Sequence, residues 1–139
     1  MSFYLVRKGK SARWTGDRSQ STVWEVENLN PFGGDREETA TGHSTQKPVE
    51  LMRRPIVNHT ARGDVVCDPF LGSGTTLIAA ELTKRICCGI ELAPEYVDLI
   101  LRRWQGLTGR NAVLADSDKT FDQIEAERAL LAQAKPEGD

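Results

Sequence analysis

The stretch GDVVCDPFLGSGTT, residues 63–76, decides the fold of this chain. It opens with a short apolar run and passes through Asp68 into a turn that holds Gly72 and Gly74. A pair of threonines follows Gly74 and leads into an apolar segment of helical length. This order of residues predicts a strand at 63–69, a glycine turn, and a helix that begins directly after the turn.

The segments that follow repeat the alternation of strand and helix. The first helix is expected at 74–84, a second apolar strand at 85–92, and a second helix at 94–107. The first strand segment has a fully apolar core, which is typical of parallel strands that are buried on both faces, and the second is also expected to be buried. Strand, helix and strand at this spacing predict a right-handed βαβ unit. The expected fold class is therefore α/β, a partial Rossmann-like sheet with flanking helices.

Further elements are expected on both sides of this unit. Pro48 opens a predicted helix at 47–60, and Pro55 is expected to kink or split that helix because it lacks an N–H donor. Weaker patterns predict three more strands and an amphipathic helix, at 3–9, 22–29, 111–116 and 120–134.

The chain divides into four segments on the basis of these patterns. The predicted segments are a strand and loop segment at 1–29, a long loop at 30–46, a ligand-binding βαβ core at 47–116, and a carboxy-terminal helix and tail at 117–139. A loop as long as 30–46 is unusual in a compact domain and often has a function.

Composition and charge restrict the class of protein. The chain has 139 residues, of which 39% are hydrophobic and 27% are charged, as in one soluble domain. It has no apolar run long enough to span a membrane and no signal-peptide core, so we expect a cytoplasmic protein without a membrane partner. The net charge is only −2, but basic residues gather in 1–20 and acidic residues in 115–139. The basic segment could contact phosphate, although a charged run is more often a solvated face.

The predicted core includes the three cysteines of the chain. Cys67, Cys87 and Cys88 show no C-x-x-C spacing and have no histidine close in sequence, so we expect reduced core thiols and no metal site. In the helix at 74–84 the side chains expected to face inward are Leu77, Ile78 and Leu82.

The glycine turn could approach three kinds of ligand. A phosphate loop requires a lysine after its last glycine, and here Thr75 occupies that place. A dinucleotide fingerprint requires a third glycine where this chain has Leu77, so a nicotinamide or flavin cofactor is an alternative with a poorer match. The third ligand is S-adenosylmethionine, which carries no phosphate but needs close backbone approach, as Gly72 and Gly74 allow.

Acidic residues favour S-adenosylmethionine over the two phosphate ligands. Asp68 would repel a pyrophosphate, whereas it suits the ammonium group of S-adenosylmethionine. Glu91 ends the second strand, 19 positions after Gly72, the distance at which an acid binds ribose hydroxyls. The simpler interpretation is that Asp68 only caps the turn and Glu91 is solvated. Their joint occurrence at the ends of two strands of one βαβ unit favours a binding site.

Three stretches together resemble a known family. HSTQKPVELMRRPI at 43–56, DPFLGSGTT at 68–76 and GIELAPEYVDLILRRW at 89–104 are similar to the carboxy-terminal half of amino-group DNA methyltransferases. The order of these motifs is similar to that of the permuted class found in bacteria and prophages. The resemblance implies methylation of adenine N6, or alternatively of cytosine N4, in double-stranded DNA.

The resemblance also implies a set of cofactor-binding residues. The segment Thr45–Pro48, with Gln46, would hold the methionine end of S-adenosylmethionine, the turn would surround the cofactor, and Glu91 would bind the ribose. The complete set of expected site residues is Thr45, Lys47, Pro48, Asp68, Pro69, Phe70, Gly72, Ser73, Gly74, Thr75 and Glu91.

One motif of the family is missing from the sequence. The catalytic tetrapeptide, an Asp, Asn or Ser followed by two prolines and an aromatic residue, has no counterpart; the nearest segment is NPFG at 30–33. The chain is therefore expected to carry the cofactor-binding half, with the catalytic half supplied by a missing amino-terminal half or a second chain. The alternative is an inactive fragment that binds the cofactor or DNA without turnover. His43 and His59 are expected to have no catalytic role.

Overall fold

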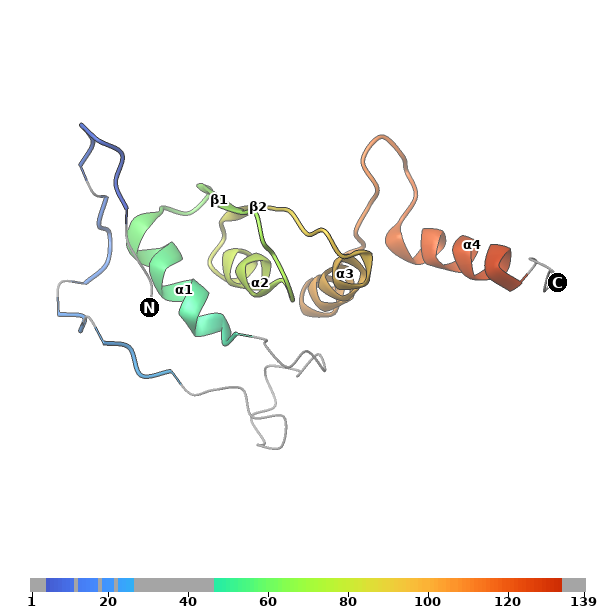
Figure 1. Cartoon of the computed structure of the whole chain (residues 1–139), viewed down its shortest axis with the longest axis horizontal. Coiled ribbons are helices and arrows are strands. Elements are labelled where there is room, and N and C mark those ends of the chain that lie inside the picture. The colour runs from blue at the N-terminus through green and yellow to red at the C-terminus, as the bar shows by residue number, and fades with distance from the viewer. Residues whose placement is uncertain (1–4, 12, 18, 22, 27–46, 134–139) are drawn as a thin grey trace.

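The computed structural model describes residues 5–11, 13–17, 19–21, 23–26 and 47–133 (Figure 1). The described residues form helices and one small parallel sheet, which confirms the α/β class. In chain order, the elements are α1 (Val49–His59), β1 (Val65–Asp68), α2 (Thr75–Leu82), β2 (Ile86–Gly89), α3 (Pro94–Thr108) and α4 (Phe121–Gln133).

The predicted βαβ unit is confirmed. β1 and β2 pair in parallel, with Val65 opposite Ile86 and Asp68 opposite Gly89. α2 connects the two strands, and the ladder extends one step beyond β2, where the Ile90 N–H donates to the Asp68 carbonyl at 2.9 Å. β1 ends where Pro69 follows, because proline cannot donate to the ladder.

Helix α1 packs against α2 and forms the core with it. Val49 and Ile56, each 6% exposed, lie in one cluster with Ile78 and Ala79 of α2. The helix runs through Pro55 and is not split there, contrary to the stronger of the two expectations for that residue. Packing on both sides of the proline, by Val49 and Ile56, offsets the hydrogen bond that it removes.

The inward face of α2 differs from the prediction. Ile78 is buried and Leu77 is half-buried, but Leu82 is 52% exposed. The buried positions are instead filled by Ala79 and Ala80, both with no exposed surface, together with the threonines at the start of the helix. Leu82 is the last residue of α2, so it extends beyond the covered part of the helix.

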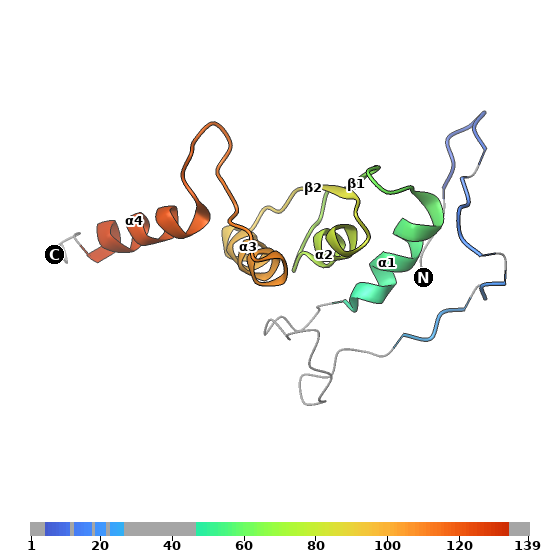
Figure 2. The ribbon, with the colours of Figure 1, turned by 180° about the vertical axis from the view of Figure 1, so that it is seen from behind.

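The sheet is covered on one face only. Helices α1, α2 and α3 all lie to one side of the strands in both views (Figures 1 and 2). Val65 and Cys67 of β1 are exposed, as are Ile86 and Cys88 of β2. The prediction of strands buried on both faces is therefore wrong for the described part of the chain, because side chains alternate between the two faces and no described helix covers the second face.

The exposure of the three cysteines follows from this one-sided cover of the sheet. Cys67 and Cys88 are exposed and Cys87 is half-buried, so the prediction of three core thiols is wrong. All three are free. Burial, and secondarily the neighbouring Asp68 carboxylate, raises the pKa of the Cys87 thiol to about 11.

Three weaker strand predictions fail in the described residues. No strand forms at 5–9, at 23–26 or at 111–116; the last segment contributes one antiparallel bridge, between Val113 and Thr120. The remaining residues of the first two predicted strands lie outside the described part. A strand needs a neighbour for its backbone groups, and apolar alternation alone does not supply one.

The described amino-terminal residues lie along the end of α1. Thr15 donates its N–H to the Asn58 carbonyl at 2.6 Å and its hydroxyl to the Val57 carbonyl at 2.7 Å. The Asn58 side chain, 2% exposed as a residue, exchanges two hydrogen bonds with the Gln20 amide at 2.8 and 3.1 Å. Arg13 pairs with Asp64 at 2.9 Å, so this basic residue has an acidic partner within the chain.

Two substitutions in α2 distinguish the observed core from the expected one. Ile78→Ala should lower the free energy of unfolding by about 2–5 kcal/mol, because it leaves a cavity between α1 and α2. Leu82→Ala removes a similar side chain from a half-exposed position and should cost about 1 kcal/mol or less. Urea unfolding followed by circular dichroism measures both. Equal losses for the two variants would contradict this description of the core.

Candidate functional site

The glycine turn joins the end of β1 to the start of α2. Gly72 has a φ of +56° and Gly74 a φ of +80°, both in the left-handed region that favours glycine. Gly74 directly precedes α2, and its N–H donates to the Leu71 carbonyl at 2.9 Å. The chain thus reverses direction at the carboxyl end of β1, where ligands bind in parallel α/β sheets.

Asp68 holds this turn in place. Its Oδ2 accepts the Thr76 hydroxyl at 2.5 Å, and its Oδ1 accepts the Phe70 N–H at 3.0 Å. Asp68 therefore caps the turn, as the simpler interpretation expected. A carboxylate has about four acceptor positions, so capping the turn is compatible with binding a ligand ammonium group.

Glu91 lies against the same turn. Its Oε2 accepts the Gly72 N–H at 2.7 Å, and its Oε1 accepts the N–H groups of Leu92 and Ala93 at 2.9 and 3.0 Å. The structure thus brings together two residues that are 19 positions apart in the sequence. A carboxylate at the end of β2 and a bare backbone turn at the end of β1 form two sides of one site.

The start of α2 also contacts the residue before Pro48 and α1. Thr75 donates its hydroxyl to the Lys47 carbonyl at 3.2 Å, which joins the start of α2 to the residues before α1. From α3, the Arg103 guanidinium donates to the Ser73 carbonyl at 3.1 Å. Thr45 and Gln46 lie outside the described residues, as do His43 and the NPFG segment.

A hollow of about 190 Å³ lies over the turn. Pockets for whole small molecules usually have volumes of about 300–1,000 Å³. The described residues therefore enclose only part of the space that a nucleoside cofactor requires. The predicted site residues that line the hollow are Lys47, Asp68, Phe70, Gly72, Ser73 and Thr75. The described site residues outside its lining are Pro48, Pro69, Gly74 and Glu91.

Sequence reasoning missed several residues of this site. Met52, Leu71 and Thr76 also line the hollow. Gly89 was missed too: a Cβ there would lie 2.5 Å from the Leu71 side chain, so this glycine lets the turn lie close to β2. The signal for Thr76 was available, because a hydroxyl eight positions after Asp68 faces it across one turn.

Gly74 packs against α3, contrary to the expectation that its missing side chain leaves room for the ligand. An added Cβ would lie 3.0 and 3.1 Å from two carbons of Ile100 in α3. Gly74 therefore permits helix packing. At Gly72, in contrast, an added Cβ would meet only the Phe70 carbonyl oxygen at 3.9 Å, so Gly72 is the glycine that faces open space.

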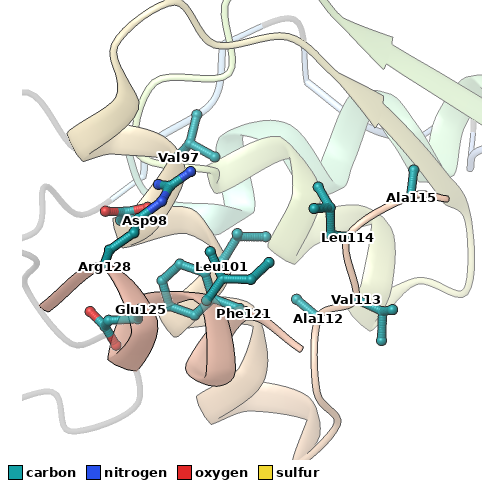
Figure 3. A pocket seen from close by; sticks show the side chains of 11 residues that line it. Val97, Asp98, Leu101, Ala112, Val113, Leu114, Ala115, Phe121, Glu125 and Arg128 are labelled. Atoms are coloured by element: carbon teal, nitrogen blue, oxygen red, sulfur yellow. The ribbon is translucent and has the colours of Figure 1, made fainter. Parts of the chain in front are cut away.

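A second hollow, of about 390 Å³, lies away from the turn. Its walls come from α3, residues 112–115 and α4, with Leu101, Phe121 and Val113 among the side chains in Figure 3. It contains none of the predicted site residues. Although it is larger, no residue of the glycine turn lines it, so we do not assign the cofactor to it.

The part of the chain that the structure describes shows neither a metal-binding cluster nor a membrane-spanning helix. It contains no cluster of three or more His, Cys, Asp or Glu side chains that could hold a metal ion. None of its helices is long and apolar enough to cross a membrane.

A matched pair of glycine substitutions tests the role of Gly74. Gly63 also has a left-handed backbone, with φ +85°, but a Cβ there would meet nothing within 4 Å. Gly63→Ala should cost about 1–2 kcal/mol, from backbone strain alone. Gly74→Ala should cost at least about 1 kcal/mol more, because the new methyl group crowds Ile100. Urea unfolding measures both values, and equal losses would refute the packing role.

Comparisons with known proteins identify the family of this chain. The N6/N4 DNA methylase family model matches residues 2–102. The chain is 41% identical over 93 residues to the type II methyltransferase M2.MboI of Moraxella bovis. The match covers 67% of this chain and 33% of that protein. It is 34% identical over 97 residues to the DNA adenine methyltransferase YhdJ of Escherichia coli K12, with 70% and 32% covered.

A solved structure of a methyltransferase also superposes on this chain. The crystal structure of the M1.HpyAVI–SAM complex superposes with a TM-score of 0.57 at 32% identity, covering 70% of this chain and 46% of that one. The chain thus spans about a third of the length of the two curated relatives. The family match, the shared α/β sheet and the turn at its strand ends lead to one conclusion: the chain belongs to the DNA methylase family of amino-group methyltransferases.

Proposed function

We propose that this chain is the cofactor-binding part of a DNA methyltransferase that transfers a methyl group to adenine N6. One observation carries the proposal: the Glu91 carboxylate and the Gly72 backbone lie 2.7 Å apart at the carboxyl ends of two parallel strands. S-adenosylmethionine is the cofactor of this family, and it supplies an electrophilic methyl group when bound. Adenine is favoured over cytosine by the similarity to YhdJ.

The proposed site has three parts. Glu91 accepts hydrogen bonds from ribose hydroxyls, and the turn lets backbone approach the cofactor closely, with Gly72 as its open position. Asp68, which already caps the turn, adds a negative charge near the ammonium group. The cofactor-binding residues of the proposal are the predicted set, namely Thr45, Lys47, Pro48, Asp68, Pro69, Phe70, Gly72, Ser73, Gly74, Thr75 and Glu91.

Catalysis and base recognition are proposed to come from sequence beyond this chain. The Asp/Asn/Ser-Pro-Pro-aromatic tetrapeptide is absent from its 139 residues, and the chain matches only 33% of M2.MboI. Chemistry on a base requires the nucleotide to be flipped into a closed pocket, and a hollow of about 190 Å³ does not provide one. The remaining part is either an amino-terminal half in the permuted order or a second cytoplasmic chain, and the two together bind double-stranded DNA.

The first test is calorimetric titration of the chain with S-adenosylmethionine. We expect saturable binding of one cofactor per chain. Glu91→Ala should weaken it by about 1–3 kcal/mol, five- to 150-fold, because it leaves polar groups of the ligand unpaired. Glu95→Ala is the matched control. It also removes a glutamate carboxylate, but from an exposed position in the first turn of α3, and it should leave the affinity for S-adenosylmethionine unchanged.

Two results would contradict the cofactor assignment. One is the absence of binding by a chain that circular dichroism shows to be folded. The other is an equal loss of affinity in the Glu91 and Glu95 variants. Because Glu91 also accepts the Gly72 N–H, urea unfolding of Glu91→Ala must accompany the titration, so that a loose turn is distinguished from a lost ligand contact.

The second test separates binding from turnover. The chain is incubated with double-stranded DNA and S-adenosylmethionine labelled in its methyl group, and label in the DNA is counted. We expect cofactor binding without methylation, since the sequence has no Asp/Asn/Ser-Pro-Pro-aromatic tetrapeptide to hold the target amino group. Methylation by this chain alone would contradict the proposal that catalysis resides in another segment.

A further inference from the structure

Helix α3 contacts the glycine turn through two residues on one of its faces. Ile100, which is 4% exposed, lies where a Cβ on Gly74 would touch it, and the Arg103 guanidinium donates to the Ser73 carbonyl at 3.1 Å. Ile100 and Arg103 are three positions apart, so they lie on the same side of the helix. Neither residue lines the hollow over the turn. We therefore expect both to act on the site through the backbone of the turn.

The peptide unit between Ser73 and Gly74 is held at both of its polar ends. Its N–H donates to the Leu71 carbonyl at 2.9 Å and closes a β-turn, while its carbonyl accepts the Arg103 guanidinium. Ser73 is only 7% exposed, and a buried carbonyl that loses its partner costs free energy. Because glycine adopts positive and negative φ about equally readily, the Gly74 side of this unit offers little resistance to rotation. Arg103 thus opposes a rotation that the residues of the turn permit.

We propose that Arg103 is a positioning residue for S-adenosylmethionine, a role that rests on the proposed cofactor function. It keeps the peptide unit between Ser73 and Gly74 from rotating. When this unit rotates, the Gly74 N–H leaves the Leu71 carbonyl, and the backbone beside Gly72 loses the conformation that faces the ligand. The apparent affinity for the cofactor then falls in proportion to the fraction of chains whose turn is competent to bind.

A direct effect of the Arg103 charge on the ligand is distinguishable from this positioning. S-adenosylmethionine carries a positive sulfonium, which a nearby guanidinium repels, whereas its demethylated form S-adenosylhomocysteine does not. Loss of a contact that fixes the backbone weakens both ligands equally. Loss of a direct charge effect changes the ratio of the two affinities.

The experiment is calorimetric titration of the whole chain with each of these two ligands. Arg103→Met keeps the apolar stem and removes the donors, so it should weaken both ligands at least about tenfold, as for loss of a charge-assisted hydrogen bond. Arg103→Lys keeps a charged donor and should recover most of the affinity. The matched control is Arg102→Met, because Arg102 pairs with Glu125 of α4, and it should leave both affinities unchanged.

Hydrogen exchange of the ligand-free chain tests the same contact independently of binding. In Arg103→Met the Gly74 amide should exchange at least about tenfold faster than in the wild type, because its local opening becomes easier. The amide of Ala79, which is fully buried in α2, should keep its exchange rate. Arg102→Met should leave both rates unchanged. Two-dimensional NMR spectra resolve the two amides.

The results distinguish a failure of this role from a failure of the proposed function. Absence of S-adenosylmethionine binding by the wild type contradicts the proposed function. An unchanged Gly74 exchange rate in Arg103→Met overturns the positioning role, as does an equal acceleration of Gly74 and Ala79, which reports general loosening. If the wild type binds, the role is also overturned by unchanged affinity in Arg103→Met, by no recovery in Arg103→Lys, or by a loss confined to one ligand.

Discussion

The hydrogen bond from the Gly72 N–H to the Glu91 carboxylate is the contact on which the site depends. It joins the turn after β1 to Glu91, which lies just beyond the end of β2, so a side-chain contact adds to the ladder that links the two strand ends. The left-handed backbone of Gly72 makes this geometry possible, and Gly89 lets Leu71 lie over the end of β2. Glu91 is only partly buried, so the contact that joins the turn to the end of β2 lies near the surface.

The stability of this site comes from the helices more than from the sheet. Two strands of four residues each are marginal alone. The buried contacts lie between α1 and α2, where small residues such as Ala79 allow close approach. The turn is fixed at three further points, by Asp68 to Thr76, by Lys47 to Thr75 and by Arg103 to Ser73. Helix packing therefore holds the backbone in the conformation that the site requires.

The sequence allowed the βαβ unit to be predicted because its signals are local. Apolar runs, a glycine turn and a proline at the start of α3 each act within a few residues. Burial could not be predicted in the same way. Cys67 and Cys88 lie in apolar runs, yet they are exposed, because burial depends on whether a second layer covers the sheet. The role of Gly74 was also misjudged, since its neighbour Ile100 is distant in sequence and is known only from packing.

Large apolar side chains that border the site are also exposed in the described residues. Phe70 is 88% exposed beside the hollow and Leu92 is 95% exposed after Glu91, so large apolar side chains border the site without a covering partner in the described residues. Apolar surface of this kind is stabilised when another surface removes it from water. A turn that is rigid before any such cover arrives needs no rearrangement to bind a cofactor. In the proposed methyltransferase, the described residues would thus supply a positioned turn, and enclosure of the target base would require additional surface.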